Sequence, residues 1–196
     1  MDPADREKLI AKKTLLNTKL SVHRFMEQHL LPWLEIYDYL RNNQIAHEVK
    51  YLASVSAEEI PAWKTRFGTG ILEPYHFNED QLIVSDTEPL HAAIAAKYPN
   101  IHPLRYVPDL PVCFSDEEDA VKVLQALEKK FSLSGQVLFF HQHLSPVLLV
   151  PFSALAENVN NLLLQFENIF IIPENHEWLL FRSMEDEWRF GKQNTK

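Results

Sequence analysis

Cysteine is almost absent from this chain, in which Cys113 is the only one among 196 residues. A single cysteine cannot form a disulfide within the chain, so a disulfide-stapled secreted domain is excluded and a reducing compartment is favoured. The opening sequence, MDPADREKLIAKK, begins with acid and contains no apolar run of signal-peptide length. We therefore expect a cytoplasmic protein.

Long apolar runs and glycine are also scarce. The longest apolar stretch, near residues 146–155, is far shorter than the roughly 20 residues that a membrane span requires, so we expect no membrane insertion. With only four glycines, a loop that cradles a phosphate on its backbone amides is disfavoured. Neither a G-x-S-x-G nor an H-E-x-x-H pattern occurs, and we expect no cofactor.

Positive charge is in short supply after residue 66. Residues 1–66 carry ten Lys and Arg against nine Asp and Glu, whereas residues 67–196 carry nine against eighteen, so the second part accounts for the net charge of −8. An acidic surface repels nucleic acid and anionic membranes, which argues against either as a partner. The electrostatic field of this acidic surface would speed the encounter with a basic protein. The alternative is that the negative charge only keeps the protein soluble.

What the chain does contain is the composition of an ordinary globular protein, with 46% hydrophobic and 23% charged residues. A chain of this length buries roughly 70% of its unfolded surface and can fold without a metal or a disulfide. We predict a single domain over 1–196. It comprises a helical N-terminal region over 1–43, a mixed α/β region over 44–135, and a hairpin, a helix and three strands over 136–191.

Helical periodicity dominates the N-terminal region. Three leucines recur near helical spacing and predict a helix over 5–20, and a broad apolar face continues over 23–40. Pro32 interrupts the second segment, so either the helix kinks there or a second helix starts with Pro32 in its first turn. The three leucines are Leu9, Leu16 and Leu20.

The middle region holds two capping boxes, in which a serine oxygen and a glutamate satisfy backbone amides reciprocally. Ser56 and Glu59 predict a helix over 57–66, and Ser115 with Glu118 predicts another over 116–131. The inner face of the second helix is Ala120, Val123, Leu124 and Leu127. The other predictions are strands over 47–54 and 81–85, a helix over 87–97 and an irregular, proline-rich stretch over 99–111.

Strand patterns fill the last third of the chain. We predict strands over 136–141, 147–150, 168–172, 178–182 and 187–190, with a helix over about 154–166 between the second and the third. Five strands separated by one helix favour an α+β fold. We expect a mainly antiparallel, four- to five-stranded C-terminal sheet with packed helices and a helical N-terminal region.

Two histidines one residue apart, His141 and His143, are the candidate for metal chemistry. Residues i and i+2 of a strand point to the same face, so both imidazoles can bind one metal ion. A metal-assisted hydrolase using His141 and His143 is therefore the enzyme hypothesis, although the sequence offers no obvious third ligand. The alternative is a polar strand end that enters a hairpin. The H-x-S half-motif of two-histidine phosphoesterases also begins at His143, but the second copy that those enzymes need is missing.

Cys113 is the candidate for a cysteine nucleophile. Val112 and Phe114 flank it, and acidic residues follow. A nucleophilic cysteine needs a base and an electropositive setting, so we predict a buried structural thiol instead.

Acids and aromatic residues are interleaved near the C-terminus. Alternate strand residues face opposite ways, so aromatic side chains can enter the core while acids line an outer rim. Exposed tryptophan beside carboxylates is the composition of a protein-binding patch, and the alternative is that the tryptophans pack the core and the acids form a solvated turn. The candidate partner-binding residues are Glu174, Glu177, Trp178, Glu185, Asp186, Glu187 and Trp188.

The last part of the chain, about 40 residues, resembles the end of small bacterial α/β proteins. In these a strand ending in proline is followed by an acidic turn, a Trp-led strand and a closing strand of the form W/F-x-F-G. The corresponding segments here are 171–173, 178–181 and 188–191. Some of the proteins that it resembles are of toxin-immunity type, which implies a protein inhibitor, whereas residues 1–135 resemble no family.

These patterns favour a non-enzymatic protein-binding module over the metal-assisted hydrolase. Its most concrete form is an immunity-type inhibitor of a basic protein, steered by the acidic charge and anchored by Trp178 and Trp188. The sequence leaves open a homodimer built on the N-terminal helices.

Overall fold

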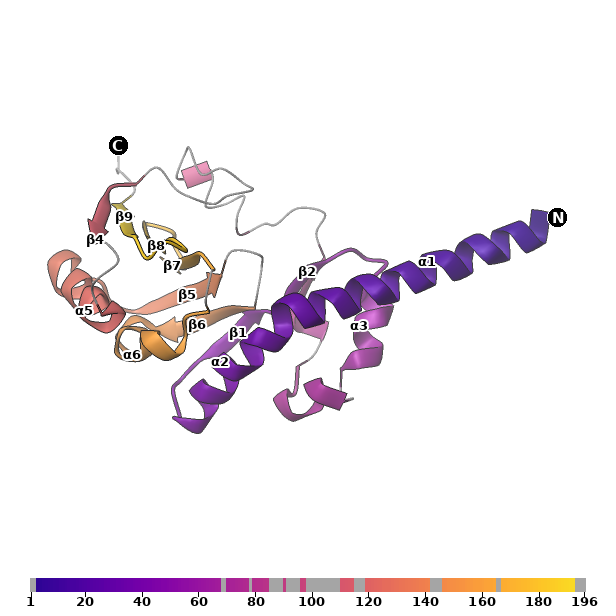
Figure 1. The fold of residues 1–196 in the computed structure, drawn as a ribbon, viewed down its shortest axis with the longest axis horizontal. Coiled ribbons are helices and arrows are strands. Elements are labelled where there is room, and N and C mark those ends of the chain that lie inside the picture. The colour runs from indigo at the N-terminus through magenta and orange to yellow at the C-terminus, as the bar shows by residue number, and fades with distance from the viewer. Residues whose placement is uncertain are drawn as a thin grey trace.

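A seven-stranded, antiparallel sheet in the order β1-β6-β5-β7-β8-β9-β4 forms the centre of the computed structural model (Figure 1). The structure describes residues 3–67, 70–77, 79–84, 90, 96–97, 110–114, 119–141, 146–164 and 167–192. The strands are β1 (Glu48–Tyr51), β4 (Val112–Phe114), β5 (Gln136–His141), β6 (Val147–Pro151), β7 (Ile169–Pro173), β8 (Trp178–Arg182) and β9 (Trp188–Lys192). The predicted α+β class is confirmed. The C-terminal third supplies five strands, and β1 and β4 extend the sheet at its two edges.

Both faces of this sheet are buried, so its central strands are apolar at nearly every position. Val137 and Phe139 of β5 face a core shared with the helices, whereas Leu138 and Phe140 face a second core that includes Leu90. In β7 all four residues from 169 to 172 are buried. A strand covered on both sides reads as a continuous apolar run rather than as an alternation.

Two helices pack on the sheet face that holds Val137 and Phe139. Helix α5 (Ala120–Phe131) begins after Asp119, whose side chain accepts a 2.9 Å hydrogen bond from the Val121 amide. The four residues that are buried on α5 are the four predicted. The predicted start at 116 is too early, because Asp119 has extended ψ and caps the helix. The second predicted capping box lies outside the described residues.

The helix that follows β6 is shorter than predicted. Helix α6 (Phe152–Asn158) passes into the 3₁₀ turn η4 (Val159–Asn161) instead of continuing to 166. Asn158 has φ of −116°, and its side chain donates to the Ala154 carbonyl at 2.8 Å while accepting from the Tyr39 hydroxyl at 2.9 Å. The Asn158 side chain thus makes hydrogen bonds both with its own helix and with Tyr39 of α2, and such side-chain hydrogen bonds favour termination of α6 at this residue.

The N-terminal region is one nearly continuous helix in three parts. These are α1 (Pro3–Phe25), the π-helical segment η1 (Met26–Leu30) and α2 (Leu31–Asn42). Pro32 lies in the first turn of α2, which is the second of the two predicted alternatives. Proline offers no N–H and its ring clashes with the carbonyl four residues earlier, and the π turn accommodates this with a bond from the Leu31 amide to the Met26 carbonyl.

A third apolar core joins the end of α1 to the residues that follow α2. It includes Val22, Leu34, Leu52 and Trp63, and α2 contributes its opposite face to the sheet. The remaining elements are β2 (Ala53–Val55), α3 (Ile60–Arg66), the 3₁₀ turns η2 (Gly70–Tyr75) and η3 (Glu79–Gln81), and β3 (Leu82–Val84), which pairs parallel with β2.

The predicted strand over 47–54 is divided between two sheets. Strand β1 pairs with β6, whereas β2 pairs with β3, and Leu52 between them donates its amide to the Gln81 carbonyl at 2.7 Å. Of the predicted helix over 87–97, only residues 90 and 96–97 are described, and of the proline-rich stretch only 110–111.

Candidate functional site

The two tryptophans predicted as partner anchors are core residues. Trp178 is 7% exposed and Trp188 is 2% exposed. The Trp178 ring packs edge-on against Phe152, with 5.8 Å between ring centroids, and lies 6.2 Å from Phe190. Both tryptophans point to the helix-covered face of the sheet and pack in the core, which is the alternative interpretation, so neither ring presents a surface to a partner.

The five acids predicted with them are divided between two turns. Glu174 and Glu177 lie between β7 and β8, whereas Glu185, Asp186 and Glu187 lie between β8 and β9. The intervening five-residue strand separates the two turns by about 13 Å. The acids therefore do not form one continuous patch.

Three of these acids also form ion pairs within the chain. Asp186 pairs with Arg182, and a Glu187 carboxylate oxygen lies 2.6 Å from an Arg189 nitrogen. Lys50 of β1 reaches Glu174 at 3.7 Å, although most of the Glu174 side chain is exposed. Partial internal neutralisation weakens the acidic rim as a surface for a basic partner.

His141 is a buried aromatic contact at the end of β5. Its ring centroid lies 4.9 Å from that of Trp33 and 5.4 Å from that of Phe139. Burial lowers the pKa of His141 from its usual 6.5 to about 3, against the opposing effect of a hydrogen bond with the Leu162 backbone, and the Arg182 charge lowers it further. The imidazole is therefore neutral in the folded protein at neutral pH.

The other residues proposed for chemistry receive no support from the described structure. His143 lies outside the described residues, and among the described residues no group of three or more His, Cys, Asp or Glu side chains is arranged to hold a metal ion. Cys113 is partly exposed rather than buried, and its Sγ lies 3.7 Å from the Pro111 carbonyl oxygen.

The first part of α1 stands away from the body of the protein (Figure 1). Every residue from 3 to 17 is exposed, which corresponds to about 22 Å of helix. We call residues 3–20 the projecting helix. Helices in proteins usually owe their stability to the packing of an apolar face against other elements, so this exposed helix is a candidate for packing against a partner.

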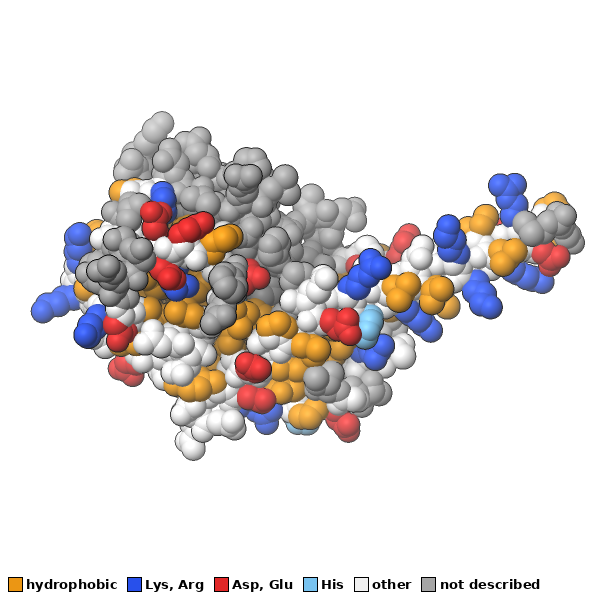
Figure 2. All heavy atoms as spheres, in the orientation of Figure 1, with side chains coloured by type: hydrophobic (Ala, Val, Ile, Leu, Met, Phe, Trp, Pro, Cys, Tyr) orange, Lys and Arg blue, Asp and Glu red, His pale blue; other side chains and the backbone are white. Residues whose placement is uncertain are grey.

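Five large apolar side chains lie on the projecting helix, and each is roughly half exposed. They are Leu9 (56%), Ile10 (56%), Leu15 (53%), Leu16 (57%) and Leu20 (44%). Apolar and basic side chains are interspersed along it in Figure 2. No acidic residue occurs between Lys8 and Arg24. Helix α1 carries six Lys and Arg residues against two Asp and Glu residues, so the rest of the chain has a more negative net charge than the whole chain.

The other end of α1 is anchored to the third apolar core. Val22 is 2% exposed, and the Phe25 ring packs edge-on against Trp63 with 5.7 Å between centroids. The Ser21 hydroxyl donates a 2.8 Å hydrogen bond to Glu59 Oε1. These contacts hold α1 at one end and leave the other end presented to solvent.

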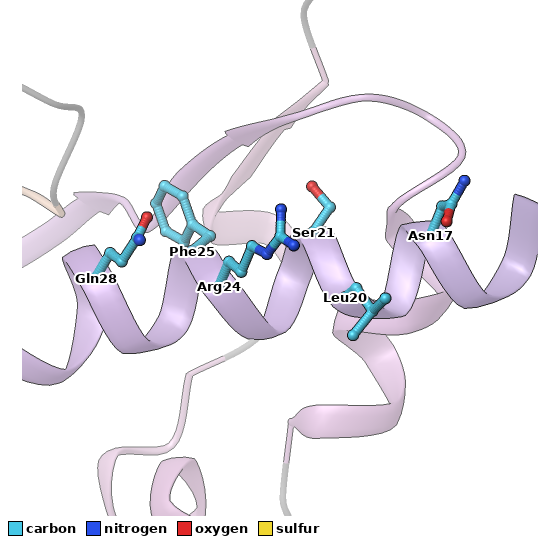
Figure 3. A pocket seen from close by; sticks show the side chains of 6 residues that line it. All are labelled: Asn17, Leu20, Ser21, Arg24, Phe25 and Gln28. Carbon is cyan, nitrogen blue, oxygen red and sulfur yellow. The ribbon is translucent and has the colours of Figure 1, made fainter.

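An open groove runs along α1 where the projecting helix meets its anchored end (Figure 3). Its volume is about 350 Å³, and it is lined by Asn17, Leu20, Ser21, Arg24, Phe25 and Gln28. Leu20 belongs both to this groove and to the exposed apolar set. The groove joins an amide-rich, basic surface to the leucines of the projecting helix.

Comparison with models of protein families, with curated proteins and with solved structures gives no match. The site therefore rests on geometry. No helix in the described part of the chain is long and apolar enough to cross a membrane.

The sequence contained a signal for the projecting helix, namely leucines at helical spacing beside lysines, but helical periodicity alone does not distinguish a buried face from an exposed one.

Proposed function

We propose that this protein is a non-enzymatic protein-binding module and that the projecting helix is its recognition element. The observation that carries this proposal is a helix whose residues 3–17 are all exposed and which displays five large apolar side chains. Clusters of exposed apolar residues rimmed by charge mark interaction sites in soluble proteins.

The energetics favour a partner over permanent solvation. Burying a leucine or isoleucine completely stabilises by about 1.5–3 kcal/mol, so covering each half-exposed side chain contributes about 1 kcal/mol. A helix that carries its apolar residues into a groove or onto other helices is a common mode of protein recognition. The anchored end, at Val22 and Phe25, reduces the ordering cost because the helix is already oriented.

An immunity-type inhibitor of a basic protein, acting in a reducing, cytoplasmic compartment, is the alternative form of a protein-binding module, and it would bind its partner through the acidic surface after residue 66. Its support is the net negative charge after residue 66 and the exposed Glu177 and Glu185. The acidic rim is weakened by its internal ion pairs, so we place recognition on the projecting helix instead.

Site-specific photo-crosslinking in the producing cells tests the proposal. A photoreactive amino acid replaces Ile10 on the projecting helix, and a matched control replaces Lys129, which is exposed on α5. We expect the Ile10 position to yield one crosslinked protein, identified by mass spectrometry, that the Lys129 position does not yield. Equal or absent crosslinking at both positions contradicts the proposal.

A further inference from the structure

The exposed leucines of the projecting helix have the spacing of a coiled-coil seam. Leu9 and Leu16 are seven residues apart, and Leu20 follows four residues later. If Leu9 and Leu16 occupy heptad position d, then Lys13 and Leu20 occupy position a. We call Leu9, Leu16 and Leu20 the leucine seam.

Basic residues flank this seam. Lys12 and Lys19 occupy position g, and Arg24 occupies position e. Positions e and g form the charge pairs between helices that select the partner and its direction. The charge that complements the flanks of the seam is therefore negative.

Self-association through the seam places like charges together. In a parallel pair the two copies of Lys13 face each other, and Lys19 of one copy faces Arg24 of the other. In an antiparallel pair Lys12 of one copy faces Lys19 of the other. Like charges in such positions select against the homodimer.

A membrane surface is a poor match for the directions of the apolar side chains. A helix that lies on a bilayer presents one apolar face. At 100° per residue, Leu15 points roughly 120° away from the seam on one side and Ile10 roughly 100° away on the other. Apolar side chains in three directions do not form the single apolar face that a bilayer surface requires.

We propose that the partner of the projecting helix is another protein that presents an acidic amphipathic helix, with apolar residues on its seam and Glu or Asp on its flanks. This inference deepens the proposed function and rests on it. Lys12, Lys19 and Arg24 would face the acidic flanks, and the leucine seam would fill the apolar interface.

The test uses the full-length protein and a labelled synthetic peptide with leucine at its a and d positions and glutamate at e and g. A second peptide carries lysine at e and g and is otherwise identical. Fluorescence anisotropy measures binding of each peptide at low and high salt. We expect the glutamate peptide to bind at least about tenfold more tightly than the lysine peptide, with the difference narrowing as salt rises.

Two variants locate the interaction on the seam and its flanks. The triple variant Leu9→Ser, Leu16→Ser, Leu20→Ser should weaken binding of the glutamate peptide by about 100-fold or more. The double variant Lys12→Glu, Lys19→Glu should reverse the preference in favour of the lysine peptide. Its matched control is Lys122→Glu, Lys129→Glu, which makes the same charge change at the same seven-residue spacing on exposed positions of α5. The control should keep the preference.

Other outcomes overturn the inference. These are equal binding of both peptides, an unchanged preference in the Lys12, Lys19 variant, seam-dependent dimers in analytical ultracentrifugation, and seam-dependent binding to phosphatidylglycerol vesicles. If neither peptide binds while Ile10 still crosslinks to one protein in cells, the acidic-helix inference fails and the proposed function survives. Absence of crosslinking defeats the proposed function itself.

Discussion

The Ser21 hydroxyl and the Glu59 carboxylate join the anchored end of α1 to the start of α3 through a 2.8 Å hydrogen bond. The second oxygen of Glu59 accepts from the Ser56 amide at 3.0 Å, which is the glutamate half of the predicted capping box. The Glu59 amide donates to the Ser56 backbone carbonyl, so a turn precedes α3 and the helix begins at Ile60 rather than at 57. One carboxylate thus serves two elements.

Replacing Glu59 by alanine removes both of these hydrogen bonds. We expect Glu59→Ala to lower the free energy of unfolding by about 1–2 kcal/mol, measured by urea denaturation, because hydrogen bonds to a charged acceptor contribute more than neutral ones. The control is Glu58→Ala at the exposed neighbouring position, which should change it by less than about 0.5 kcal/mol. Equal effects at the two positions would show that Glu59 does not hold α1.

The buried His141 predicts a pH-dependent loss of stability. Its folded pKa of about 3 lies below the unfolded value of 6.5, so only the unfolded chain binds the proton between these values. The stability that a neutral His141 supplies is complete above pH 6.5 and is lost progressively as pH falls toward 3. The loss amounts to at most about 1.4 kcal/mol per pH unit.

The measurement compares wild type with His141→Gln by urea denaturation from pH 7 to pH 4. Carboxylates titrate in both proteins, so the difference between the two curves isolates the histidine. We expect wild type to lose more stability than the variant on acidification. Parallel curves would mean that His141 is not buried as a neutral ring.

Trp188 should behave as a core residue and not as a binding anchor. Trp188→Ala removes a ring that is 2% exposed, and we expect a loss of about 3–5 kcal/mol in the free energy of unfolding. Met184→Ala, at a side chain that is 47% exposed nearby in the chain, is the control and should cost less than about 0.5 kcal/mol. A well-folded Trp188 variant with unchanged stability would restore the anchor interpretation.

The acidic turn allows its structural and binding roles to be separated. Asp186 has a φ of 65°, which asparagine also adopts readily, so Asp186→Asn should keep the backbone conformation. Asp186 also pairs with Arg182, whose side chain is only 15% exposed, and the variant removes this ion pair. We expect a cost of about 1 kcal/mol, whereas Glu185→Gln should be neutral within about 0.5 kcal/mol. Thermal unfolding of both variants measures this. Equal melting temperatures would show that the ion pair contributes nothing.

Much of the sheet could be predicted because the local composition of its central strands is typical of β-structure. The runs at β5, β7 and β8 are dense in branched and aromatic residues, and their predicted bounds agree with the structure within one residue. The prediction merged edge strand β1 with β2 and did not include edge strand β4. Strands of three or four residues are defined by pairing with distant segments and not by their own composition.

The candidate site was harder to predict, for a related reason. Alternation of apolar and polar residues assigns faces to a strand only when one face is solvated. Both faces of β8 are covered, so Trp178 could not be placed from the pattern. Likewise, the leucines of the projecting helix have the spacing of a core-facing stripe. Only the structure shows that no element of the described chain covers them.

The affinity of the purified, crosslinked partner for wild type and for the triple seam variant tests the central claim most directly. We expect Leu9→Ser, Leu16→Ser, Leu20→Ser to weaken binding by about 100-fold or more, as for truncated hot-spot residues. The free energy of unfolding should change little beyond the small helix-propensity cost of serine, because all three side chains are exposed. A folded variant that binds the partner as tightly as wild type would contradict the assignment of recognition to the projecting helix.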